Sequence, residues 1–170
     1  ADALKKIGVK LIYVGIESAD EEVRKDANRT SDTNENQIEK VRFLEKKGIK
    51  VKAMYIIGMP ADTKDTFKKT VEYSKKIKSS YAQYSVFTPY PGTPVFKEYK
   101  NKITSKKYED FTQWKLVFEH QNLSNKDVLD LLNYSYKEYY TNPKWAIHFI
   151  LNKIKDFYEN LHNRLFWLHR

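Results

Sequence analysis

The sequence predicts an α/β fold in which three parallel strands alternate with helices and a helical region follows. A short unit recurs, in which a helix end, a Lys-x-Gly step and an apolar run follow one another, around Gly8 and again around Gly48. All five glycines lie in the first 92 residues and none in the last 78. This shift in composition predicts two parts, an α/β part over 1–104 and a helical part over 105–170.

The first two strands are predicted from the two copies of this unit. They read "LKKIGVKLIYVGIES" at 4–18 and "LEKKGIKVKAMYIIGMP" at 44–60. A glycine directly after a helix suits the left-handed conformation that ends it, and the apolar run that follows is typical of a buried strand. We therefore expect strands near 11–17 and 51–58.

Helical spacing connects these strands and leads to a third. Residues 32–44 place apolar side chains three and four positions apart, and Asp32, Thr33 or Asn34 can cap the start. Residues 63–77 repeat the spacing, and an apolar stretch near 81–88 reads as a strand. Strands that alternate with helices at this pitch predict a parallel sheet with right-handed crossovers.

The third strand ends in "TPYPGTP" at 88–94, which contains three of the chain's five prolines. One proline suffices for a turn, so three fix the conformation of a whole loop. Beyond it, Ser124 is a plausible N-cap for a helix over 124–140, and Pro143 suits the first position of a long aromatic helix over 142–170.

Composition narrows the classes of protein. Lys and Arg number 31 against 22 Asp and Glu, a formal charge of +9 that we attribute mainly to solubility because it is spread along the chain. There is no cysteine, so the chain forms no disulfide and supplies no thiolate to zinc or to an iron–sulfur cluster. No signal peptide or run of 18 apolar residues occurs, and we expect a cytoplasmic protein.

The functional residues of parallel α/β folds gather beyond the carboxyl ends of the strands. Here these ends read "GIES" at 15–18, "GMPAD" at 58–62 and the proline loop. Glu17 ends a buried strand, which favours a ligand-facing carboxylate over a helix cap. Gly58 either makes a turn or lets a flat ligand approach the backbone.

Together, the three strand ends resemble the second half of the barrel of radical S-adenosylmethionine (radical SAM) enzymes. The similarity is greatest to the subgroup that carries a cobalamin-binding domain, in which the third loop reads Thr-Pro-x-Pro-Gly-Thr-Pro and an "F-x-H-x-N-L-S" segment follows. This chain has "FEHQNLS" at 118–124. The resemblance covers roughly residues 1–142 and implies the C-terminal half, about three βα units, of a partial TIM-type barrel.

The resemblance also implies which residues bind the cofactor. Glu17 and Ser18 would reach the ribose or methionine part of S-adenosylmethionine. The second strand and the loop after it would pack on adenine. Backbone groups of the third strand and its loop would read the adenine edge. The implied residues of the second strand and its loop are Ile56, Gly58, Met59 and Pro60, and those of the third are Val86, Thr88, Pro89 and Tyr90. Ala61 and Asp62 replace the Gly-Glu pair usual in the family, which makes the local turn uncertain.

The same resemblance implies a longer enzyme. The family's three-cysteine loop, which holds a four-iron four-sulfur cluster, belongs to the first half of the barrel, which is not in this chain. We therefore expect a fragment without catalytic residues or metal ligands of its own, whose partner is the missing N-terminal half. The intact enzyme would make a 5′-deoxyadenosyl radical from S-adenosylmethionine and modify a small-molecule or lipid substrate, with methylation or C–C bond formation as outcomes if a cobalamin domain precedes.

Three further features leave alternatives open. His148, His162 and His169 lack the spacing of metal ligands, and His120 falls within "FEHQNLS", where it can bridge a turn. The last helix interleaves aromatic and basic residues, which fits a packing helix and also a membrane-surface helix. A basic, tyrosine-rich α/β domain is also compatible with a nucleic-acid-binding module, although no RNA-recognition motif is present and we expect no specific nucleic acid.

Overall fold

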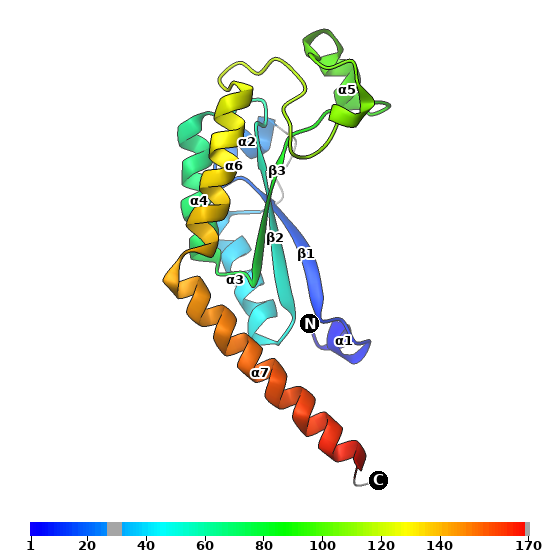
Figure 1. Cartoon of the computed structure of the whole chain (residues 1–170), viewed down its shortest axis with the longest axis vertical. Helices are drawn as coiled ribbons and strands as arrows, with labels where there is room; N and C mark the ends of the chain where they lie inside the picture. The colour runs from blue at the N-terminus through cyan, green and yellow to red at the C-terminus, as the bar shows by residue number, and fades with distance from the viewer. Residues whose placement is uncertain (27–31, 169–170) are drawn as a thin grey trace.

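The computed structural model describes residues 1–26 and 32–168. Strands and helices alternate through the first half of the chain, and two long helices end it (Figure 1). The elements in order are α1 (Asp2–Lys6), β1 (Leu11–Glu17), α2 (Glu21–Asp26), α3 (Asn34–Lys46), β2 (Lys50–Ile57), α4 (Lys64–Ile77), β3 (Tyr81–Val86), α5 (Pro94–Tyr99), the 3-10 turns η1 (Lys100–Lys102) and η2 (Tyr108–Asp110), α6 (Asn125–Tyr140) and α7 (Pro143–Leu168).

The three strands form one parallel sheet in the order β1-β2-β3. Leu11 pairs with Lys50 at the start of β1, and Lys52 pairs with Tyr81 at the start of β3. The predicted parallel α/β fold is confirmed, and the strands begin and end within two residues of the predicted ranges. Their carboxyl ends therefore meet at one edge of the sheet.

Local signals in the sequence set the helix boundaries. Thr33 is the residue that caps α3, and the Thr63 side chain accepts a hydrogen bond from the Thr66 amide at the start of α4. Ser124 caps α6 through a reciprocal pair of hydrogen bonds with Asp127. Each side-chain oxygen satisfies an amide that has no partner in the first turn of a helix.

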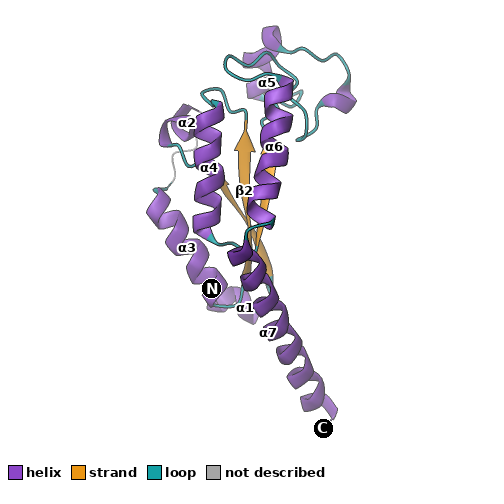
Figure 2. Ribbon diagram, turned by 60° about the vertical axis from the view of Figure 1, so that its left-hand side comes forward, coloured by secondary structure: helices purple, strands orange, loops and turns teal. Residues whose placement is uncertain are grey.

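Helices cover only one face of the sheet. In Figures 1 and 2, α3, α4 and α6 lie together on the same side of the strands. Side chains of β2 alternate accordingly: Tyr55 and Ile57 are fully buried beneath these helices, whereas Met54 and Ile56 on the opposite face are only partly buried. Among the residues that the structure describes, no helix covers the opposite face of the sheet.

The outer edge of β3 is hydrogen-bonded to tyrosines of α6. The Tyr140 hydroxyl accepts from the Ala82 amide at 3.0 Å and donates to the Ala82 carbonyl at 2.7 Å. The Tyr136 hydroxyl does the same for the amide and carbonyl of Tyr84, at 3.2 and 3.1 Å. These hydroxyls occupy the backbone groups to which a further strand would bind.

The segment between α5 and α6 is mostly irregular. Apart from η1 and η2 it contains one isolated antiparallel bridge, between Ile103 and Phe118, which ties the segment to itself. The α-helical character of the second half therefore begins at α6. In the described part of the chain, no helix has the length and apolar content needed to cross a membrane.

Candidate functional site

The candidate site lies where the three strands end, on the face that the helices leave open. Glu17 ends β1, Gly58 directly follows β2 and Thr88 lies two residues beyond β3. Parallel pairing brings these ends to one edge, as in other α/β folds with functional loops. The three stretches predicted to carry the site thus meet at this edge.

Glu17 has an unusual backbone conformation. Its φ is 68°, in the left-handed region that residues other than glycine rarely adopt, and the pairing of β1 with β2 is irregular between Gly15 and Glu17. The irregularity turns the Glu17 carboxylate back along the open face. A Cβ atom added to Gly15 would lie 2.7 Å from Glu17 Oε1, so the absence of a side chain at Gly15 makes room for the carboxylate.

Ser18 holds the loop after β1. Its side chain is buried, and its hydroxyl lies 3.1 Å from the Thr70 hydroxyl of α4 and accepts a hydrogen bond from the Asp20 amide. The Thr70 hydroxyl also accepts from the Ala19 amide at 3.0 Å. The structure therefore gives Ser18 a role in fixing the start of the loop, and its predicted contact with a ligand stays a prediction.

A buried carboxylate closes the loop after β2. Asp62 Oδ2 accepts hydrogen bonds from the amides of Gly58 and Met59 at 2.9 and 3.1 Å, and Thr66 Oγ1 lies 3.0 Å from Oδ1. Burial raises the pKa of Asp62 from 3.8 to about 6, because the loss of solvent outweighs the three hydrogen bonds that favour the charged form. Asp62 thus makes a tight turn in which Gly58 has a φ of 78°.

His120 holds the same loop from the other side. Its Nδ1 accepts hydrogen bonds from the amides of Asn122 and Leu123, so the proton lies on Nε2, which donates to the Met59 carbonyl at 2.9 Å. The Asn122 side chain donates to the Asp62 carbonyl at 3.0 Å. Of the alternatives for His120, the structure supports the bridge to a turn.

These contacts determine which parts of the β2 loop face the open side. Met59 is buried beneath the loop, and Pro60 is partly buried. Ile56, the last residue of β2 on the open face, is partly exposed there. Of the residues predicted to pack on adenine, Ile56 offers an apolar side chain to that face, whereas the Gly58 amide is already bonded to Asp62.

The proline loop after β3 is also tied down. The Val86 amide donates to the Gln113 carbonyl at 2.7 Å, and the Thr88 hydroxyl lies within 3.0 Å of the carbonyls of Val86 and Thr112. Pro89 is buried, and the Tyr90 side chain is 46% exposed. These hydrogen bonds hold the start of the proline loop, and contact of its backbone with adenine stays a prediction.

Sequence reasoning missed Gln113. Its side-chain oxygen lies 3.2 Å from Gln83 Nε2 and 3.1 Å from Ser85 Oγ, both on β3. Together with its backbone contact to Val86, these bonds place Gln113 beside the end of β3, next to the candidate site. No motif marks it, because the segment around it is irregular and approaches β3 only through tertiary structure.

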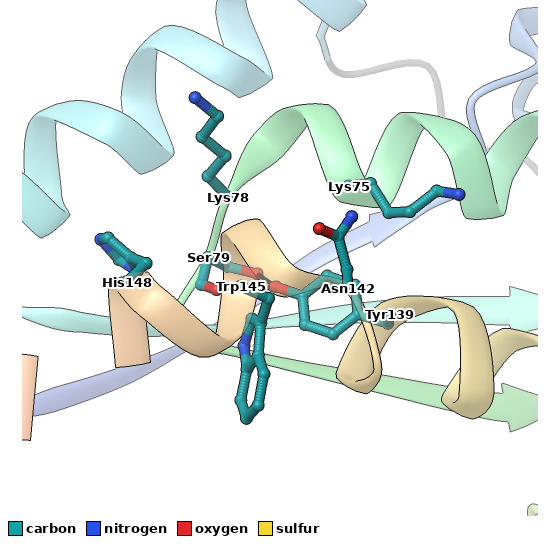
Figure 3. A pocket seen from close by; sticks show the side chains of 7 residues that line it. All are labelled: Lys75, Lys78, Ser79, Tyr139, Asn142, Trp145 and His148. Atoms are coloured by element: carbon teal, nitrogen blue, oxygen red, sulfur yellow. Dashed lines mark hydrogen bonds between the residues drawn. The ribbon is translucent and has the colours of Figure 1, made fainter. Parts of the chain in front are cut away.

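A separate cavity of about 170 Å³ lies at the other end of the sheet (Figure 3). It is formed by the end of α4, the residues before β3 and the junction of α6 and α7, with Ser79 and Tyr139 in contact at its centre. Lys75 at its rim is paired with Glu72 and Glu138. The cavity lies at the start of β3, so it is apart from the site at the carboxyl ends of the strands.

Comparison with protein families matches residues 1–74 to the model described as the radical SAM superfamily. An uncharacterized methyltransferase of Pyrococcus horikoshii is 29% identical over 163 residues, which are 94% of this chain and 34% of that protein. A bacteriochlorophyllide d C-12(1)-methyltransferase of Chlorobaculum tepidum is 24% identical over 90% of this chain and 36% of its own length. The chain thus spans about a third of the curated relatives it matches.

Two solved structures share the fold. Coproporphyrinogen III oxidase (HemN) from Escherichia coli, described as a radical SAM enzyme, aligns with a TM-score of 0.56 at 20% identity, over 79% of this chain and 27% of its own. The radical S-adenosylmethionine methyltransferase TsrM from Kitasatospora setae aligns with a TM-score of 0.53 at 23% identity, over 59% of this chain and 20% of its own. The three-stranded sheet with its helices therefore has the architecture of part of a radical SAM barrel.

Proposed function

We propose that this chain, which matches the radical SAM superfamily model over residues 1–74, supplies the nucleoside-binding side of an S-adenosylmethionine site in a longer enzyme. The observation that carries the proposal is the placement of the Glu17 carboxylate over Gly15 on the open face, at the edge where the strands end. A carboxylate there can accept hydrogen bonds from two ribose hydroxyls or from a cationic amine.

The surrounding residues fit such a ligand. The Glu17 carboxylate occupies the space above Gly15, and Ile56 offers apolar surface to a purine ring. Asp62 and His120 hold the β2 loop, and Gln113 and the prolines hold the β3 loop, before any ligand arrives. Because these loops are ordered in advance, binding costs less conformational entropy.

In members of this superfamily, bound S-adenosylmethionine and a four-iron four-sulfur cluster supply a 5′-deoxyadenosyl radical for hydrogen abstraction. This chain contains no cysteine, so in the proposed enzyme the thiolates that hold the cluster come from the missing N-terminal half of the barrel. The residues of this chain bind and orient the nucleoside. The open edge of β1 is where we expect the strands of that half to pair.

We propose methylation or ring formation as the outcome of the reaction. The names of the relatives support this, since they include methyltransferases and an anaerobic magnesium-protoporphyrin IX monomethyl ester cyclase. The solved structure of TsrM is described with cobalamin and a [4Fe-4S] cluster bound, which supports a cobalamin domain in the longer enzyme. The proposed substrate is a small molecule or a lipid.

The test is calorimetric titration of S-adenosylmethionine into the full-length enzyme with its cluster. Glu17→Gln keeps the size of the side chain but removes its charge, and we expect about a tenfold weaker affinity, since a hydrogen bond to a charged group contributes about 1.5–3 kcal/mol. Gly15→Ala places a methyl group where the carboxylate lies, so it should weaken binding to a similar degree.

The control is Glu39→Gln, which removes an exposed carboxylate from α3. Its affinity should equal that of the wild type. Unchanged affinity in both Glu17→Gln and Gly15→Ala, with folding verified by circular dichroism, would show that the ligand does not use this part of the open face.

A further inference from the structure

Near its start, helix α7 packs on the rest of the protein. The Trp145 ring lies 4.7 Å from the Tyr140 ring and its indole nitrogen donates to the Ser80 carbonyl, while Phe149 stacks on Trp145 and meets Tyr81 edge-on. Beyond this contact the helix runs away from the sheet and from the other helices in both views (Figures 1 and 2). Trp145 and Phe149 therefore mark the face of α7 that the body of the protein covers.

A second apolar stripe on α7 faces away from that contact. Its six members are between 48% and 65% exposed and recur at intervals of three and four residues. At 3.6 residues per turn, this spacing places them on one face about 120° wide. The stripe consists of Ile147, Ile150, Leu151, Ile154, Phe157 and Tyr158.

The charges beside the stripe indicate what covers it. In the sequence, the positions that the helical repeat places next to the stripe include Lys153 on one side and Lys155 on the other, whereas Asp156 and Glu159 fall on the opposite face. Lys153 Nζ lies 5.5 Å from the centre of the Phe149 ring, so its aliphatic part covers apolar surface. An apolar face bordered by cations, with the acidic residues behind it, is typical of helices that bind anionic lipid surfaces.

A second copy of the helix fits this pattern less well. Helices that pair through such a stripe carry opposite charges at its borders, which attract across the seam. Here both borders are basic, so two copies would repel each other.

We propose that α7 is a docking surface for an anionic membrane, on which the helix lies parallel to the surface with the six-residue stripe in the acyl boundary. Lys153 and Lys155 would then lie at the level of the lipid phosphates, and Phe157 and Tyr158 at the interface, where aromatic side chains are favoured. The cofactor site is not part of this surface.

The experiment is co-sedimentation of the full-length enzyme with vesicles. Vesicles of phosphatidylglycerol and phosphatidylcholine are compared with vesicles of phosphatidylcholine alone, at low and at high sodium chloride. We expect binding to the anionic vesicles that weakens with salt and is at least tenfold weaker on the neutral ones. Ile150→Ser with Ile154→Ser should reduce the binding at least tenfold, since both side chains are exposed and their loss leaves the core intact.

The matched control is Asn152→Ser, a substitution on the same turns but outside the stripe. It should bind vesicles like the wild type. Equal binding by the stripe variant and the wild type would overturn the proposal. So would a dimer in analytical ultracentrifugation that the stripe variant abolishes without any effect of vesicles, because this result assigns the stripe to a second copy.

Discussion

The two edges of the sheet differ in what the rest of the chain does with them. At β3, the Tyr136 hydroxyl bonds to the amide and carbonyl of Tyr84, and the Tyr140 hydroxyl bonds to those of Ala82. The Gln113 carbonyl accepts a hydrogen bond from the Val86 amide. At β1, no described strand pairs with the outer edge.

The difference shows where this sheet can grow. A new strand at β3 would have to displace tyrosines that are packed against the core, whereas the outer edge of β1 pairs with no strand that the structure describes. The loops at the strand ends differ in the same way. Those after β2 and β3 are hydrogen-bonded to residues of the second half of the chain, whereas Glu17 ends β1, the strand whose outer edge no described strand pairs with. Contacts within the chain therefore stabilise the β3 edge, whereas the β1 edge is where a further strand can pair.

The largest expected effect is the loss of the tyrosine hydroxyls. Tyr136→Phe combined with Tyr140→Phe keeps the ring packing but leaves four backbone groups of β3 without partners, and it should lower the free energy of unfolding by about 3 kcal/mol. Urea unfolding followed by circular dichroism measures the change. Tyr134→Phe, on the same helix and without a hydrogen bond to β3, is the control. If both proteins unfold at the same urea concentration, β3 is not held by these hydroxyls.

A smaller effect is expected at Asp62, which holds the loop after β2. Asp62→Ala leaves the amides of Gly58 and Met59 without an acceptor and should cost about 2 kcal/mol, whereas the amide oxygen of Asp62→Asn can still accept both bonds. The pKa of Asp62 in the folded protein, about 6, exceeds its ordinary value of 3.8. Between these values the folded state holds a proton that the unfolded state has released.

The contribution of Asp62 to stability should therefore decrease as the pH rises from about 4 to about 6. Urea titrations across this range measure it, and the difference between the wild type and Asp62→Asn isolates it from other carboxylates. A difference that does not change with pH would mean that Asp62 is charged throughout, with its three hydrogen bonds outweighing its burial.

The sequence predicts best what neighbouring residues determine. The glycines after α1 and α3, the threonine caps and Pro143 act within a few positions, and the strands and helices they delimit are where the sequence places them. The tyrosine contacts to β3 join residues 52 and 58 positions apart, and no local pattern encodes them. The left-handed conformation of Glu17 could not be predicted from the sequence either, because it accompanies the irregular pairing with β2 and does not follow from its residue type.

The smallest effect is expected on the open side, where Tyr13 of β1 is 61% exposed and the Lys52 ammonium group lies 5.1 Å from the centre of its ring. Tyr13→Ser in the 170-residue chain should change the free energy of unfolding by no more than about 0.5 kcal/mol, because little surface is buried there. The same substitution in the full-length enzyme should cost several times more if the missing half of the barrel covers this face. Equal and small losses in both proteins would mean that the open face stays open, and the sheet would then have to be completed elsewhere than over Tyr13.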